Sequence, residues 1–258
     1  MIFFVGLLSL TGQIIAQKTN PPGTIWLRDN IYIDAAPLAN IHYREYEHTM
    51  RSFYNFNLDS IIKNAASAPF FGNDHRNFLD NMHPVPNPDS SQYKINQDAP
   101  VSWGHWVSFR EYLNNSKYNF YPLINISYDL AVQFCRWRTA MVQLSYSNNF
   151  PIEERYKFHK KIKYRLATSE EWEYALKKFS GSENFCLLKA RHKEILPRLN
   201  QKMNCFRLTN LSEMVSEKNI VKGCSWKNKD CKSDLNTTFE SKSPADWITF
   251  RCVCEVED

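Results

Sequence analysis

Residues 164–175 read YRLATSEEWEYA, a stretch that predicts a short strand leading directly into a helix. Thr168 is a good N-cap, and Glu171 follows three residues later, which is the spacing of a capping box. Behind this cap, apolar residues recur at helical spacing: Trp172, Ala175, Leu176 and Phe179. We therefore expect a strand over 164–167 and a capped helix packed on the core. Arg165 and Glu171 are expected to be structural polar partners.

The sequence on either side of this stretch predicts an α+β fold. Residues 23–34 alternate apolar and polar side chains around Asp29-Asn30, which predicts a hairpin. Asn40 and Ser127 are N-cap residues, and each precedes apolar side chains at helical spacing. From residue 210 onward the pattern is one of short strands and turns. Helices set among short strands, without the βαβ rhythm of a parallel sheet, are typical of the α+β class.

The composition indicates one globular domain. Of the 258 residues, 43% are hydrophobic and 23% charged, and the 17 Phe, 13 Tyr and 7 Trp supply enough apolar volume for a sizeable core. No internal repeat is visible. Residues 72–100 are rich in Asn, Asp, Pro and Ser, which indicates a long irregular excursion and not a second domain. We assign residues 18–258 to a single domain.

The segment 1–17, MIFFVGLLSLTGQIIAQ, carries no charged residue. It is too short and too interrupted by glycine for a membrane span, and it suits a signal peptide that ends near Ala16. A buried first strand is the alternative interpretation. We expect an exported protein of the periplasm or cell surface, with membrane association only through a complex.

The spread of the basic residues and the absence of several known motifs exclude some classes of function. The net charge is +5, but the basic residues are spread along the chain and do not form the contiguous footprint that binding of nucleic acid needs. The sequence contains no GxSxG, P-loop, GxGxxG or HExxH motif. We therefore expect a protein or peptide partner, and no nucleic acid.

Seven cysteines lie at positions 135, 186, 205, 224, 231, 252 and 254. None forms a CxxC pair and no matching His pair is present, so a structural zinc site is not indicated. In an exported protein several cysteines should form disulfides, and the odd number leaves at least one without a partner in the chain.

Four segments, taken in order, carry a family resemblance. They are residues 32–40 (YIDAAPLAN), residues 121–137 (YPLINISYDLAVQFCRW), the 164–175 stretch, and the set 210–215 (NLSEMV), 223–226 (GCSW) and 250–253 (FRCV). Over roughly residues 24–254 the chain thereby resembles the formylglycine-generating enzyme, or sulfatase-modifying factor, family. The similarity is nearest to bacterial members, including those of gliding-motility and secretion assemblies.

The resemblance implies a fold and a disulfide. The fold would be the family's variant of the C-type-lectin-like fold, which is low in regular secondary structure. The family joins the cysteine of the second segment to that of the final strand, which implies a bridge from Cys135 to Cys252. A bridge that closes so long a loop would stabilise by up to about 4–5 kcal/mol on chain-entropy grounds.

Active members oxidise a substrate cysteine to formylglycine with copper(I) held by two thiolates, because this soft ion prefers sulfur. The corresponding positions here are Asn228 and Ser233, so both thiolates are missing. This departure predicts a pseudoenzyme, and we do not expect it to bind copper.

Two nearby cysteines leave three interpretations open. Cys224 and Cys231 could form a local disulfide, act as a relocated copper pair, or pair with other cysteines of the chain. Ser225 beside Trp226 would orient a substrate thiol in an active relative, or is only a turn hydroxyl. These four residues are the candidate catalytic set.

Calcium is a second candidate cofactor. Family members use a loop with carbonyl and carboxylate oxygens, the ligands that a hard cation requires. Here Glu213 and the carbonyls of Thr209 and Leu211 are the candidate ligands. Phe206 replaces the first oxygen ligand, and Arg207 adds an adverse charge.

Two functional hypotheses follow. The first is a non-catalytic binding or assembly component of the cell envelope, with Trp103 and Trp106 as the binding surface, because clustered aromatic residues often anchor partners. The alternative role for these two residues is to pack the excursion onto the core. The second hypothesis is a copper-dependent oxidase that uses Cys224 and Cys231.

Overall fold

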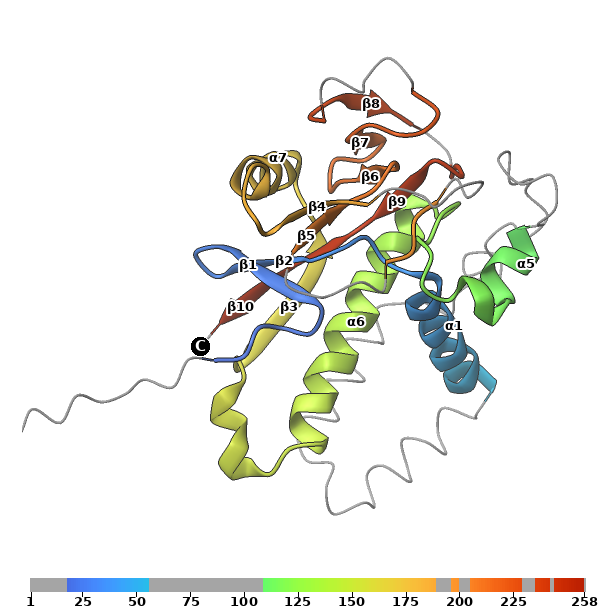
Figure 1. The fold of residues 1–258 in the computed structure, drawn as a ribbon. Helices are drawn as coiled ribbons and strands as arrows, with labels where there is room; N and C mark the ends of the chain where they lie inside the picture. The colour runs from blue at the N-terminus through green and yellow to red at the C-terminus, as the bar shows by residue number, and fades with distance from the viewer. Residues whose placement is uncertain are drawn as a thin grey trace, which may run out of the picture.

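The structure, a computed structural model, describes residues 18–55, 109–188, 196–199, 205–228, 235–241 and 244–257 (Figure 1). The predicted signal segment, both tryptophans of the predicted binding surface, Cys231 and Ser233 lie outside the described residues.

The main sheet joins both ends of the described chain. Its strands are β1 (Thr24–Arg28), β2 (Ile31–Asp34), β10 (Cys252–Glu257) and β3 (Lys161–Leu166), in the order β1-β2-β10-β3, and all neighbours are antiparallel. The predicted hairpin over residues 23–34 is confirmed. It turns at Asp29, whose φ of 43° is a conformation that Asp tolerates better than most residues.

Two helices cover opposite faces of this sheet. Along β10, Cys252, Cys254 and Val256 share a core cluster with α6 (Tyr128–Asn148), whereas Val253 belongs to the cluster of α7 (Ser169–Phe179). This division follows from the alternation of side chains along a strand. Both helices begin as predicted: Ser127 caps α6, and Thr168 and Glu171 form a complete capping box on α7.

Shorter elements surround this layer. A second sheet has the order β8-β7-β6-β9, from β8 (Thr238–Glu240), β7 (Ile220–Lys222), β6 (Ser212–Met214) and β9 (Ile248–Phe250). In addition, β4 (Phe185–Leu187) pairs in parallel with β5 (Phe206–Leu208). The remaining elements are α1 (Asn40–Asn55), α5 (Phe109–Asn114), η1 (Ser116–Tyr118) and η2 (Ile152–Lys157).

The mixture of helices and short strands confirms the α+β prediction. In Figure 1, α1 and α6 lie on the side of the molecule away from α7 and the second sheet. Arg165 binds the buried Glu171 through two hydrogen bonds of 2.7 Å, so the predicted structural role of this pair is confirmed. None of the described helices is long and apolar enough to cross a membrane.

Candidate functional site

The loop of the predicted catalytic residues follows β7 and sits against α7. Gly223 has a φ of 89°, and a Cβ built there would lie 3.0 Å from the Trp172 ring of α7. The Ser212 hydroxyl donates to the Gly223 carbonyl at 2.7 Å, and the Trp226 amide donates to the Asn210 carbonyl at 2.8 Å. The start of the loop is therefore fixed by glycine geometry and by contacts with residues 210–212.

Cys224 is disulfide-bonded, and its partner is not among the described residues. Asn228, which stands where the resemblance expects the first thiolate, offers a carboxamide in place of a sulfur ligand. A sulfur atom held in a disulfide is not a thiolate ligand for copper(I). The described part of this loop therefore does not fit a copper(I) ion.

Ser225 is buried and Trp226 is partly buried. Oγ of Ser225 has no hydrogen-bond partner among the described residues; the same holds for Nε1 of Trp226. Two polar groups left in this state cost free energy unless a further group meets them. The structure thus brings three of the predicted catalytic residues, Cys224, Ser225 and Trp226, onto one short loop.

The predicted calcium ligand Glu213 has another role. Its carboxylate binds Arg251 through Nε at 2.5 Å and Nη2 at 2.6 Å, and it accepts a hydrogen bond from Trp172 Nε1 at 3.0 Å. The Glu213 and Arg251 side chains have no exposed surface. Because this carboxylate already neutralises a buried arginine, the arrangement does not fit a calcium ligand.

The remaining calcium candidates add no charge. Thr209 and Leu211 are buried beside β5 and β6. Leu211 could offer only its carbonyl oxygen, and Thr209 its carbonyl and hydroxyl oxygens. Burial, together with the charge of Arg251, lowers the pKa of nearby Arg207. Within the described ranges no group of three or more His, Cys, Asp or Glu side chains is placed to hold a metal ion.

Three cysteines gather between α6 and β10. The sulfur atoms of Cys135 and Cys252 lie 3.3 Å apart in the core, well beyond the about 2.05 Å of a disulfide, and Cys254 is a third buried thiol. The two cysteines that the resemblance pairs are therefore neighbours, but they are thiols in this structure, and their bridge stays a prediction. Burial raises the pKa of Cys254 to about 12 and that of Cys252 far above its usual range.

A disulfide joins Cys186 on β4 to Cys205, just before β5. The sequence alone allows either cysteine to be a partner of Cys224 or Cys231. The parallel pairing of β4 with β5, which sets Cys186 opposite Arg207, brings the two cysteines together.

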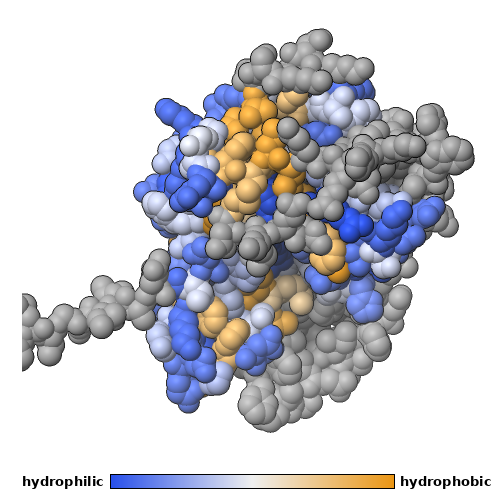
Figure 2. Space-filling model, in the orientation of Figure 1, coloured by the Kyte–Doolittle hydropathy of each residue, from blue (hydrophilic) through white to orange (hydrophobic). Residues whose placement is uncertain are grey.

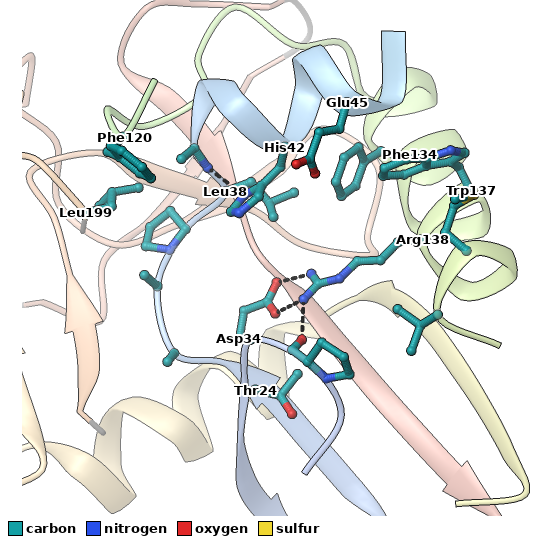
Figure 3. Close-up of a pocket in the computed structure, with 18 of the residues that line it drawn as sticks. Thr24, Asp34, Leu38, His42, Glu45, Phe120, Phe134, Trp137, Arg138 and Leu199 are labelled. Carbon is teal, nitrogen blue, oxygen red and sulfur yellow. Dashed lines mark hydrogen bonds and ion pairs between the residues drawn. The ribbon is translucent and has the colours of Figure 1, made fainter. Parts of the chain in front are cut away.

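A cavity of about 1210 Å³ lies away from the cysteine loop, between the segment after β2, α1 and α6 (Figure 3). Much of its wall is apolar or aromatic, from Leu38, Phe120, Phe134, Trp137, Met141 and Leu199. The sequence held no motif for this cavity, because its walls come from segments far apart in the chain.

An ion pair and a histidine are among the polar groups of the cavity (Figure 3). Arg138 on α6 binds both carboxylate oxygens of Asp34 at 2.8 Å, and Asp34 also accepts from the Cys252 amide at 2.8 Å. Nδ1 of His42 accepts from the Ala39 amide at 3.2 Å.

The titration of His42 reflects its place on the cavity wall. His42 is an exposed residue that lines the cavity. Burial, and then the positive charge of Arg138, lower the pKa of His42 to about 4, whereas Asp34 acts in the opposite direction. At neutral pH the ring is therefore uncharged.

Comparison with known families matches residues 5–209 to the sulfatase-modifying factor enzyme 1-like domain. That range is more than half of the 258 residues. This chain belongs to the sulfatase-modifying factor family. No curated protein matches the chain.

The family match covers three of the four segments that carry the resemblance, and ends before residues 210–215. In this sulfatase-modifying factor family member, the cysteine loop and Arg251 thus lie beyond the matched range. The structure nevertheless joins the two parts, because Trp172 of the third segment donates to Glu213 of the fourth.

Proposed function

We propose that this member of the sulfatase-modifying factor family is a non-catalytic binding or assembly component of the cell envelope. The observation that carries the proposal is that Cys224 is held in a disulfide. In the same loop, Asn228 stands at a position where the resemblance expects a thiolate. The buried pair of Glu213 and Arg251 supports it, since a candidate metal ligand serves there to hold the scaffold.

The proposal includes the place and the partner of the protein. The uncharged segment 1–17 supports export to the periplasm or cell surface, and the proposed partner is a protein or peptide. Figure 2 shows an apolar strip beside α7 and the second sheet on an otherwise largely hydrophilic face. Exposed apolar surface of this kind often marks an interaction site. The proposed fold variant is C-type-lectin-like, and the proposed relatives are gliding-motility components.

The alternative function is a copper-dependent oxidase that converts a substrate cysteine to formylglycine. It requires Cys224 and Cys231 to be reduced and close enough to share one ion. An anaerobic copper(I) titration of the mature domain separates the two functions. We compare the untreated protein, the gently reduced protein and a Cys231→Ser variant.

We expect the untreated protein to show no tight one-to-one copper binding. After reduction, the Cys231→Ser variant should bind copper no more weakly than the unsubstituted protein. Tight one-to-one binding that the substitution abolishes would overturn the proposal and favour the oxidase. The reduced protein would then be tested with sulfatase-like cysteine peptides.

The partner side of the proposal is tested at Trp103 and Trp106. Changing both to alanine should disrupt complex formation while the unfolding temperature stays unchanged. Unchanged complex formation would remove these residues from the proposed binding surface.

A further inference from the structure

The cavity between α1 and α6 has the character of a binding site for a small molecule. Ligand sites are concave, mostly apolar, and carry a few fixed polar groups, in volumes of roughly 300–1,000 Å³. This cavity of about 1210 Å³ is large enough for such a ligand. None of the cavity residues belongs to the cysteine loop, so ligand binding in the cavity is independent of the proposed function.

One hydrogen-bond donor on the cavity wall is left for a ligand. Because Nδ1 of His42 accepts from the Ala39 amide, the neutral ring carries its proton on Nε2, which makes no hydrogen bond within the described chain. A protonated ring nitrogen can only donate, so this position calls for an acceptor.

The ionised groups of the wall favour an uncharged ligand. Asp34 is neutralised by Arg138, which also donates to the Pro22 carbonyl at 2.7 Å. Glu45 and Arg207 line the same cavity with opposite formal charges. The formal charges of these four residues cancel, so a ligand with a net charge would lose its hydration without a matching countercharge.

The aromatic walls indicate the shape of the ligand. Phe134 and Trp137, one helical turn apart on α6, stand near Arg138 and face the cavity in Figure 3, with Phe120 near its other end. Aromatic pairs add an attraction beyond simple burial. We propose that this cavity binds an uncharged aromatic compound with a carbonyl oxygen, which accepts a hydrogen bond from His42 Nε2.

Three naphthalene probes separate the elements of this proposal. Acetylnaphthalene has the ring and the carbonyl, ethylnaphthalene has the same shape without the acceptor, and naphthoate has the ring with a negative charge. Affinities for the full chain are measured by equilibrium dialysis at neutral pH. We expect acetylnaphthalene to bind about five- to tenfold more tightly than ethylnaphthalene, which is the effect of one net hydrogen bond. Naphthoate should bind more weakly than acetylnaphthalene.

Substitutions locate the binding. His42→Phe should remove most of the advantage of acetylnaphthalene over ethylnaphthalene, whereas His48→Phe, another histidine on the cavity wall, should keep it. Val142→Phe, which fills the cavity, should weaken all probes about tenfold or more. Val132→Phe is the matched control on the same helix, outside the cavity lining, and thermal unfolding verifies that each variant is folded.

Three results would overturn the proposal. They are no binding of acetylnaphthalene by the folded full chain, tighter binding of naphthoate than of acetylnaphthalene, or affinities that Val142→Phe and His42→Phe leave unchanged.

Discussion

Arg251 and Glu213 form an ion pair with no exposed surface on either side chain, with Nε of Arg251 2.5 Å from Oε2 of Glu213. Arg251 also donates to the carbonyls of Asp34 and Arg207, and thereby ties β9 and β10 to the end of β2 and to β5. The pair thus connects the two sheets at the centre of the fold.

Replacing Glu213 by Gln should strongly destabilise the protein. The change leaves the buried guanidinium without its counterion, a loss of about 3–5 kcal/mol in the free energy of unfolding. Glu255→Gln is the control, because Glu255 pairs with Arg165 but is partly exposed, so less than about 1 kcal/mol is expected. Urea unfolding measures both. Equal losses in the two variants would contradict a special role for Glu213.

Alanine substitutions at two glycines with similar backbone angles can distinguish the cost of backbone strain from the cost of a crowded Cβ atom. Gly223 and Gly181 have φ values of 89° and 85°, but only a Cβ at Gly223 would meet Trp172, at 3.0 Å. We expect Gly181→Ala to cost about 1–2 kcal/mol from the left-handed conformation alone. Gly223→Ala should cost about 1–3 kcal/mol more, because the core must also make room. Denaturant unfolding of the two variants gives the difference, and equal costs would show that the Trp172 contact is unimportant.

His42 should make stability depend on pH. Its pKa of about 4 lies below the 6.5 of an unfolded chain, mainly because of burial and then Arg138. The unfolded state therefore binds more protons between these two values, so the contribution is complete above about pH 6.5 and is lost as the pH falls toward about 4. The slope of unfolding free energy against pH should be smaller in His42→Gln than in the unsubstituted protein. An unaltered slope in His42→Gln would contradict the prediction.

Removal of the bridge between Cys186 and Cys205 should loosen the region around β4 and β5. The double replacement by serine should lower the free energy of unfolding by about 2–4 kcal/mol. Changing the exposed Glu183 to glutamine near the same strands controls for a general effect of surface substitution. Mass analysis of the untreated chain should detect the bridge between the two peptides, and its absence would refute the assignment.

Local features of this fold were predictable from the sequence, and distant pairings were not. Thr168 and Glu171 identify the start of α7 because capping acts within one helical turn. In contrast, Glu213 and Arg251 are 38 residues apart, and Asp34 and Arg138 are 104 apart. Such pairs depend on how the sheets and helices assemble.

The candidate site shows the same division. The resemblance placed Cys224, Ser225 and Trp226 on one loop, but the role of Glu213 required the position of Arg251. His42 and Trp137 gave no signal, because a histidine and a tryptophan on separate amphipathic helices most often pack in the core. The charge of Asp34 in the otherwise apolar strand IYID was the one available hint of the cavity.

The order of the main sheet has a consequence for how the protein is made. The interior strand β10 comes after all other described strands in the chain, yet it pairs with both β2 and β3. During synthesis the ribosome therefore releases β1, β2 and β3 before their common neighbour exists. Contacts between such distant segments form slowly, so the nascent polypeptide should stay open, and accessible to chaperones, until the last strand emerges.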